Sequence, residues 1–150
     1  MKQKPIILIV EDEFVKRLVL REQLHRFGVV QEAKCEEKAT EKIEKLHREG
    51  QPPCVAVVDL RLPAPGGIDP DAGFRVIEHL KTEFPKTPVI VLTVRNDRDG
   101  WEKAGKLTNV RYFFTKPWNS EELKKAVKVC RENKARGLKC VGQVEGVSDV

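Results

Sequence analysis

The sequence predicts an α/β fold in which a doubly wound parallel sheet carries helices on both faces. Short apolar runs that resemble strands alternate five times with segments of helical periodicity. Three of these runs are almost continuously apolar, which is typical of strands that are covered on both faces. Repeated strand–helix units of this kind build parallel sheets, because each helix crosses the sheet before the next strand begins.

Five segments have the length and composition of strands. We predict strands at Ile6–Val10, Val29–Ala33, Cys54–Asp59, Val89–Thr93 and Tyr112–Thr115. A flavodoxin-like (βα)5 topology with strand order 2-1-3-4-5 fits this alternation. It places strands one and three side by side where the winding reverses, and ligands bind at this point in open α/β sheets.

Between the strands, apolar residues recur at the three- and four-residue spacing of amphipathic helices. The four sets are Leu20, Leu24 and Phe27; Ala39, Ile43 and Leu46; Phe74, Ile77 and Leu80; and Leu123, Ala126, Val127 and Cys130. Asn119 or Ser120 is expected to cap the last helix, because their side chains can accept from its first N–H groups. Gly137 is expected to end that helix.

The composition indicates a single soluble domain. The chain has 150 residues, of which 40% are hydrophobic and 34% charged, and its longest apolar runs have about five residues, far below the roughly 20 of a membrane span. We expect a cytoplasmic domain over residues 1–136, and a tail or linker over 137–150. The valines of this tail also fit a strand that pairs elsewhere, or a disordered end. The four cysteines lack C-x-x-C spacing, which favours reduced thiols over a metal site.

The net charge is +5, with many of the cations in the last third of the chain. They fall on a helical face without interleaved aromatic residues, which argues against direct nucleic-acid binding.

Polar residues that suit a phosphoryl group and a divalent metal follow four of the predicted strands. Glu11 and Asp12 follow the first strand, Asp59 ends the third, Thr93 ends the fourth and Lys116 follows the fifth. The carboxyl ends of parallel strands line one crevice, so these side chains should converge. Three carboxylates that close together repel by about 4 kcal/mol per pair at 4 Å and an effective dielectric constant near 20. Lys116 and a Mg²⁺ ion would offset this repulsion.

The loop after the first strand reads E-D-E and lacks the glycines that cradle phosphates in nucleotide-binding loops. Asp59 is the expected nucleophile, because carboxylates form aspartyl-phosphate intermediates. Mg²⁺, Lys116 and Thr93 would each hold an oxygen of the transferred group, since this chemistry depends on positioning and charge.

The strings ILIVEDE, VAVVDLRLP, VIVLTV and FFTKPW resemble the response-regulator receiver domain of two-component signalling, over roughly residues 4–133. The resemblance implies that Asp59 is the phosphoacceptor. It implies that Glu11, Asp12, Asp59 and the backbone carbonyl of Arg61 hold Mg²⁺, which Mn²⁺ can replace. Thr93 and Phe113 match the switch hydroxyl and the switch aromatic residue, and Lys116 matches the phosphate-binding lysine.

The resemblance also implies partners. The donor would be a sensor histidine kinase or a histidine phosphotransfer protein. The output would be a downstream protein target or an output domain outside these residues, and a phosphorylation-dependent homodimer is a further alternative. Such a domain catalyses only its own phosphorylation and dephosphorylation. It would act either as a stand-alone regulator or as part of a longer protein.

The sequence departs from the family pattern in three places. We expect six residues to be inserted within Ala64–Ala72, because Gly73 follows Asp59 by fourteen positions instead of eight. The segment between Arg95 and Arg111 lacks the usual A-G-A-x-D string. Finally, Arg61 and Arg95 stand two residues beyond Asp59 and Thr93, and our hypothesis is that they shield the phosphoryl group from water and set its lifetime.

Two rival functions remain at this stage. A degenerate receiver would bind partners without being phosphorylated. An aspartyl-nucleophile phosphatase would need a second acid two residues after Asp59, where this chain has Arg61.

Overall fold

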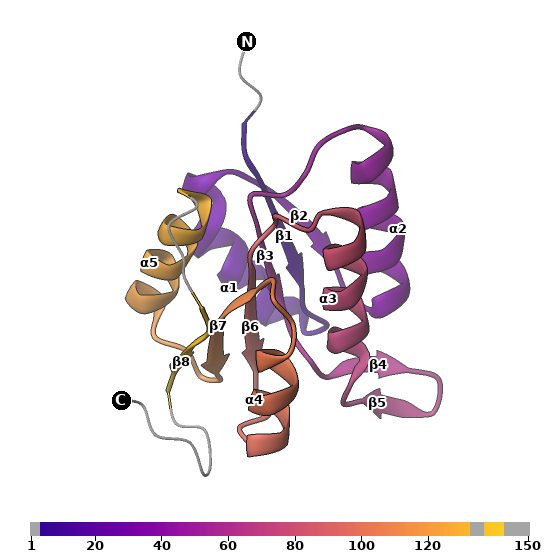
Figure 1. Ribbon diagram of the computed structural model, residues 1–150, viewed down its shortest axis with the longest axis vertical. Coiled ribbons are helices and arrows are strands. Elements are labelled where there is room, and N and C mark those ends of the chain that lie inside the picture. The colour runs from indigo at the N-terminus through magenta and orange to yellow at the C-terminus, as the bar shows by residue number, and fades with distance from the viewer. Residues whose placement is uncertain (1–3, 133–136, 143–150) are drawn as a thin grey trace.

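The computed structural model describes residues 4–132 and 137–142. Its centre is a six-stranded sheet in the order β2-β1-β3-β6-β7-β8 (Figure 1). All neighbouring strands of this sheet are parallel. The first five strands lie in the predicted order, which confirms the flavodoxin-like topology. The strands of the sheet are β1 (Ile6–Val10), β2 (Val29–Ala33), β3 (Val55–Val58), β6 (Val89–Thr93), β7 (Val110–Thr115) and β8 (Lys139–Val141).

Helices cover both faces of the sheet (Figure 1). They are α1 (Phe14–Leu24), followed by the 3-10 turn η1 (His25–Phe27), α2 (Glu36–Arg48), α3 (Ala72–Glu83), α4 (Arg98–Gly105) and α5 (Ser120–Arg131). Helices α1 and α5 share one hydrophobic cluster, and α2, α3 and α4 share the other. The sheet therefore separates two cores.

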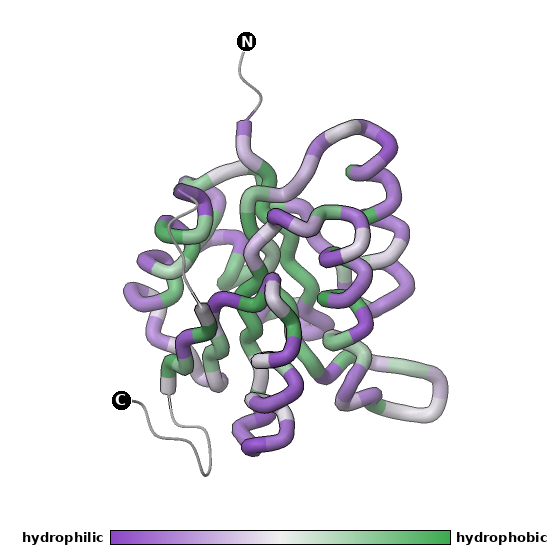
Figure 2. Tube along the Cα trace, viewed as in Figure 1, coloured by the Kyte–Doolittle hydropathy of each residue, from purple (hydrophilic) through white to green (hydrophobic). Residues whose placement is uncertain are grey.

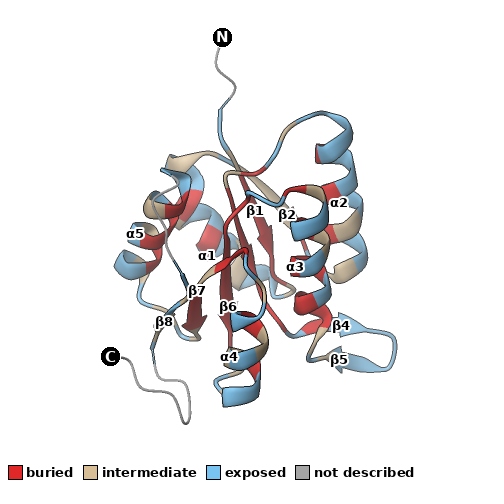
Figure 3. Cartoon of the chain, viewed as in Figure 1, coloured by how far each residue is buried: buried red, intermediate tan, exposed pale blue. Residues whose placement is uncertain are grey.

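Alternate residues of each central strand enter opposite cores, as the two-residue repeat of a strand requires. In β1, Ile7 and Ile9 pack on the side of α1 and α5, whereas Leu8 and Val10 pack on the side of α2 and α3. Figure 2 shows the hydrophobic strands enclosed by more hydrophilic helices, and Figure 3 shows that the central strands are buried. This burial explains the nearly continuous apolar runs of the sequence.

The ends of α5 agree with the sequence at one terminus only. The Asn119 side chain accepts a hydrogen bond from the Glu122 N–H at 3.0 Å, which confirms the predicted cap. The helix ends at Arg131, so the prediction that Gly137 ends it is wrong. The last buried apolar residue of α5 is Cys130, and Gly137 lies just ahead of β8.

Part of the predicted tail is the sixth strand of the sheet. Residues Lys139–Val141 form β8, which pairs in parallel with β7. Of the alternatives for the tail, a paired strand is therefore the one observed here. Residues 143–150 lie outside the described part of the chain.

The insertion after Asp59 folds into a small antiparallel hairpin, β4 (Leu62–Ala64) and β5 (Gly67–Asp69). It projects from the body of the protein near the start of α3 (Figure 1). The Arg75 guanidinium bridges this hairpin to α2: it contacts Asp69 and binds both carboxylate oxygens of Glu36, at 2.8 to 3.1 Å. The predicted long loop is thus an ordered element held by ion pairs.

Candidate functional site

Glu11 and Asp12 occupy the turn between β1 and α1. The Glu11 N–H donates to the carbonyl oxygen of Ala33 at 3.0 Å, which continues the pairing of β1 with β2. The Arg17 guanidinium donates to the carbonyl oxygens of Glu11 and Asp12, at 2.9 and 3.0 Å. These hydrogen bonds fix the backbone from which both carboxylates project.

Asp59 follows β3 directly, and the neighbouring backbone holds it in place. Its N–H donates to the Val10 carbonyl oxygen at 2.9 Å, and its Oδ1 accepts from the Arg61 N–H at 3.1 Å. Gly73, at the start of α3, packs against the Asp59–Leu60 backbone so closely that an added Cβ would overlap the Asp59 carbonyl oxygen. A glycine is therefore required at this position, although the insertion has moved it along the sequence.

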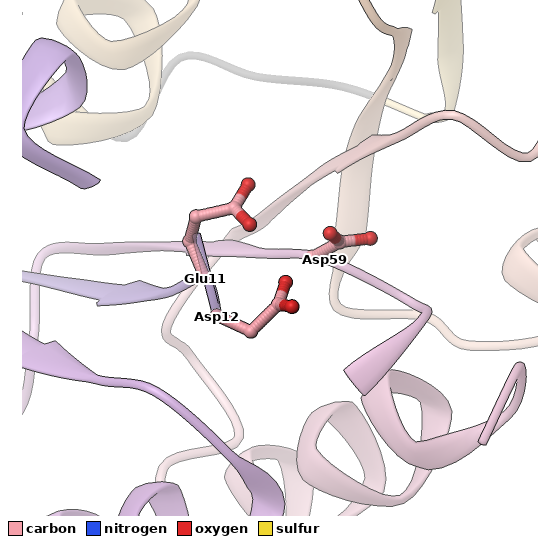
Figure 4. Close-up of side chains that lie close together, drawn as sticks. All are labelled: Glu11, Asp12 and Asp59. Carbon is pink, nitrogen blue, oxygen red and sulfur yellow. The ribbon is translucent and has the colours of Figure 1, made fainter. Parts of the chain in front are cut away.

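The three acids meet in one cluster. Each offers a carboxylate oxygen that lies within 4.8 Å of the others (Figure 4). Glu11 and Asp59 are buried, with 1% and 5% of their surface exposed, whereas Asp12 is half-buried. Lys116 lies against the two buried acids: its Nζ is 2.9 Å from Asp59 Oδ2 and also contacts Glu11 Oε1.

The pKa values at the site reflect burial and close charges. Burial raises the pKa of Glu11 to about 7; Asp59 adds to this rise, and Lys116 opposes it. Burial alone would lower the pKa of Lys116, but the charge of Asp59 and the hydrogen bond to Glu11 raise it above its ordinary value. Lys116 is therefore a cation that compensates only part of the negative charge around it.

This cluster fits a divalent metal ion. Mg²⁺ prefers oxygen ligands and binds through one or two carboxylates together with water and phosphate oxygens. The cluster offers three carboxylates against one ammonium group, and Asp12 keeps it open to solvent. Glu11, Asp12 and Asp59 are the residues that would hold the ion.

Thr93 and Phe113 lie on the neighbouring strands and are fully buried. The Thr93 hydroxyl oxygen accepts from the Arg95 N–H at 3.2 Å, and the Lys116 N–H donates to the Thr93 carbonyl oxygen at 2.8 Å. The Phe113 ring meets Trp101 of α4 edge to face, at a centroid distance of 5.8 Å. Phe113 thus already occupies an inward position.

Arg61 and Arg95 differ in how they are held. Arg61 is exposed. The Arg95 guanidinium donates to Asp71 and Asp97 at 2.8 Å and to Asp99 at 2.7 Å, and its side chain is 15% exposed. These three carboxylates hold Arg95 between the hairpin side and the start of α4. Both arginines line a groove of about 490 Å³ together with Ile68, Pro70, Asn96 and Asp97.

The sequence analysis missed the carboxylates that hold Arg95. Asp97 and Asp99 follow it at two and four residues, close enough along the chain to have indicated local ion pairs. Asp71 comes from a distant segment, and nothing in the sequence marks that contact. Hydrogen bonding from Arg95 lowers the pKa of Asp71 and outweighs the slight burial of this acid.

Comparisons with known proteins agree with one another. The family model described as the response regulator receiver domain matches residues 7–128. A CheY-like receiver domain protein from Methanospirillum hungatei JF-1 is 21% identical, with a TM-score of 0.72, over 87% of this chain and 95% of that chain. No curated protein sequence matches the chain.

Two structures of the response regulator DrrB are also similar. The BeF3-activated receiver domain is 24% identical, with a TM-score of 0.68, over 87% of this chain and 99% of that chain. The Thermotoga maritima protein, an OmpR/PhoB homologue, is 25% identical, with a TM-score of 0.69, over 92% of this chain and 57% of that chain. The likenesses below 25% identity establish the fold.

Within the part of the chain that the structure describes, no helix has the length and apolar character needed to cross a membrane.

Proposed function

The chain belongs to the response regulator receiver domain family, and on that premise we propose that it accepts a phosphoryl group on Asp59 from a phosphohistidine and thereby switches the binding of a partner. The observation that carries this proposal is the contact of Lys116 with Asp59 inside a cluster of three carboxylates. A structural ion pair would need one acid, whereas here Lys116 is shared by Asp59 and Glu11, and Asp12 adds a third carboxylate to the cluster.

The transfer itself makes one bond and breaks another. A carboxylate oxygen of Asp59 attacks phosphorus, the bond from phosphorus to the donor imidazole nitrogen breaks, and the electron pair returns to that nitrogen. A bound Mg²⁺ would neutralise charge on the phosphoryl oxygens. The ion would be held by Glu11, Asp12, Asp59 and the Arg61 carbonyl. Lys116, which already contacts Asp59 Oδ2, would move its hydrogen bond to a phosphoryl oxygen.

The proposed switch involves Thr93 and Phe113. The Thr93 hydroxyl would turn toward the new phosphoryl group, because the charged phosphoryl oxygens are strong hydrogen-bond acceptors. Phe113 is buried beneath α4 already, so phosphorylation would stabilise this position rather than create it. The consequence is an altered surface for a downstream protein, an output domain or a second copy of the chain.

The phosphodonor would dock on α1. Four apolar side chains of this helix are exposed beside the acidic cluster: Phe14 (68%), Val15 (68%), Leu18 (43%) and Val19 (39%). Large side chains gathered on one exposed helix face indicate a protein contact. The stripe starts two residues after Asp12, so a protein bound there can present a phosphohistidine to Asp59. We expect a sensor histidine kinase or a histidine phosphotransfer protein in this place, and the cytoplasm as the compartment.

Arg61 and Arg95 are proposed to set the lifetime of the phosphoryl group. Arg61 is exposed and can approach the group freely, whereas Arg95 would first have to leave its carboxylate partners. Dephosphorylation rates of Arg61→Ala and Arg95→Ala test this role. Rates equal to that of the wild type in both variants would contradict it.

The phosphorylation is tested by intact mass after incubation with acetyl phosphate, with and without Mg²⁺. We expect a base-labile adduct of one phosphoryl group that requires Mg²⁺ and is lost in Asp59→Asn. A folded wild type that gains no adduct would contradict the proposal and favour a module that works without phosphorylation. The site does not favour that alternative, because the three acids and Lys116 are all present and lie together. We expect no turnover of other substrates.

A further inference from the structure

The strand β8 extends the sheet beyond the predicted five strands, at its β7 edge. Lys139, Cys140 and Val141 pair in parallel with Tyr112, Phe113 and Phe114. In Figure 1, β8 lies along the outer edge of β7. An edge strand leaves backbone groups unpaired, and a further strand satisfies them. The chain thus covers this edge with its own C-terminal segment.

Side chains of this segment pack into both cores. Leu138 and Cys140 lie against the cluster that contains Phe113, and Val141 lies against the cluster on the side of α1 and α5. Cys140 is also the register partner of Phe113. The position of β8 therefore depends on the same aromatic residue that the receiver chemistry is proposed to switch.

A close contact joins the end of β8 to the site. Gly142 has a φ of 95°, and a Cβ added there would overlap the Thr115 Oγ1. Thr115 is opposite Thr93 in the register of β6 and β7, and Lys116, the next residue, contacts Asp59. A continuous series of neighbouring residues thus runs from Asp59 through Lys116 and Thr115 to Gly142.

The contacts that dock β8 on β7 are also weak enough for the strand to detach. In the described part of the chain three register pairs hold it, and Lys139 is exposed. Short edge strands with few buried contacts open locally at a small cost in free energy compared with global unfolding. A modest change at the site can therefore shift the balance between docked and detached β8.

We propose that β8 is a detachable strand that closes the β7 edge and that docks more tightly when Asp59 is phosphorylated; this inference rests on the proposed function. The direction follows from Phe113. With β8 docked, Phe113 is fully buried. Phosphorylation is proposed to stabilise this buried position of Phe113. Linkage is reciprocal, so detaching β8 weakens the binding of a phosphoryl group or its analogue by the same factor. Couplings of this kind are commonly about 5-fold or more.

Cys140 provides a built-in probe of docking, with Cys35, ahead of α2, as an internal reference. Alkylation of the full chain with iodoacetamide, read by peptide mass spectrometry, gives both rates in one sample. We expect faster alkylation of Cys140 in Gly142→Ala, because the new Cβ meets Thr115. The second substitution Thr115→Ala should slow the rate again, since the nearest remaining side-chain atom, the Thr115 Cβ, is 3.7 Å away.

Gly137→Ala is the matched control for this series. Its φ of 67° carries a similar backbone penalty, but an added Cβ meets nothing within 4 Å. We therefore expect a smaller change than in Gly142→Ala. A Cys140 rate in Gly142→Ala that is no faster than in the control, or that Thr115→Ala fails to slow, would overturn the docking of β8.

The link to Asp59 is tested with acetyl phosphate and Mg²⁺ in the wild type and in Asp59→Asn. Phosphorylation should slow Cys140 alkylation about 5-fold, with Cys35 unchanged and no effect in Asp59→Asn. Adduct formation by mass with an unchanged Cys140 rate would overturn the linkage and leave the proposed function standing. The absence of any adduct would overturn the proposed function, and the linkage with it.

Discussion

Lys116 is the residue on which the charge balance of the site depends. Its ammonium group is the partner of both Asp59 and Glu11, and all three side chains are at least nine-tenths buried. Two buried carboxylates that lose their only shared cation face both desolvation and mutual repulsion.

We therefore expect Lys116→Ala to lower the free energy of unfolding by about 3 kcal/mol in the presence of EDTA. Mg²⁺ should recover part of this loss, because it supplies the missing positive charge. Urea denaturation with and without Mg²⁺ measures both effects. Lys106→Ala, at an exposed position, is the control and should change stability by roughly 0.5 kcal/mol or less. Equal stabilities of the two variants in EDTA would contradict this account.

The ion pairs of Arg95 should make the stability of the fold depend on pH. Their carboxylates are more exposed than those at the Lys116 site. The hydrogen bond from Arg95 lowers the pKa of Asp71 from its ordinary value of 3.8. A lowered pKa means that Asp71 stabilises the fold at pH values above 3.8, and that this contribution is lost as the pH falls through the lower, folded-state value.

NMR titration of the Asp71 carboxyl group measures this shift directly. In Arg95→Gln, the pKa of Asp71 should rise toward 3.8, because the charged donor is gone. Arg98→Gln serves as the control, since the Arg98 side chain binds Glu102. An Asp71 pKa that is the same in wild type and Arg95→Gln would show that Arg95 does not hold it.

Among the elements, α3 packs tightly against the backbone of Asp59, the proposed phosphoacceptor. Its second residue, Gly73, leaves no room for a Cβ between the helix and the Asp59–Leu60 backbone. Gly73→Ala should therefore shift α3 or the Asp59 turn, at a cost of about 1–3 kcal/mol in stability. Phosphorylation by acetyl phosphate should slow as well.

Gly105→Ala, at the end of α4, is a suitable comparison, because its φ is not positive and the nearest atom to an added Cβ is the Leu138 Cδ2, at an ordinary contact distance of 3.8 Å. Thermal unfolding and the rate of adduct formation separate the two variants. If Gly73→Ala kept the Tm and the rate of adduct formation of the wild type, the close packing would matter neither for stability nor for phosphorylation.

Helix α1 should affect phosphorylation only when the donor is a protein. Leu18→Asp places a charge in the exposed apolar stripe without entering the core, since Leu18 is 43% exposed. We expect phosphotransfer from a histidine kinase or phosphotransfer protein to fall at least tenfold, while the rate with acetyl phosphate stays the same. A parallel loss with both donors would instead indicate damage to the site.

For the molecule as a whole, metal binding should increase the free energy of unfolding. A ligand that binds only the folded state at 100 times its Kd adds about 2.7 kcal/mol, which corresponds to roughly 5–10 °C in Tm for a chain of this size. We expect Mg²⁺ to raise Tm in this way, and Asp12→Asn to abolish most of the rise. A monovalent salt at matched ionic strength is the control, and a wild-type Tm indifferent to Mg²⁺ would contradict the proposed site.

The sequence predicted those features that repeat or that follow from strand ends. β1, β2 and β6 have the predicted bounds. In β1 and β6 the reason is that a buried strand shows its limits in an almost unbroken apolar run. The convergence of Glu11, Asp12 and Asp59 followed from parallel topology alone. The predicted third strand was one residue too long at each end, and the fifth began two residues too late, because Arg111 interrupts its apolar run.

What the sequence did not predict depends on contacts between distant segments. The Ala64–Ala72 insertion looked like a loop, since its prolines and glycines hide a hairpin that Arg75 ties to α2. The pairing of β8 with β7 could not be chosen among the alternatives for the tail, because three residues are too short to show a pattern. The Asp71 partner of Arg95 lies 24 residues away and has no local signal.

The parallel pairing of β8 with β7 also decides at which edge of the sheet the described segment 137–142 ends. β8 runs parallel to β7, so Gly142 lies at the carboxyl edge of the sheet, beside Thr115 and within one strand of Lys116. Pro5, ahead of β1, lies at the opposite edge. A fluorophore or a fused protein joined after Gly142 would therefore be tethered at the acidic cluster and could disturb or report its chemistry. The same attachment ahead of Pro5 would leave that chemistry alone, which makes the N-terminal side the safer choice for immobilising the protein.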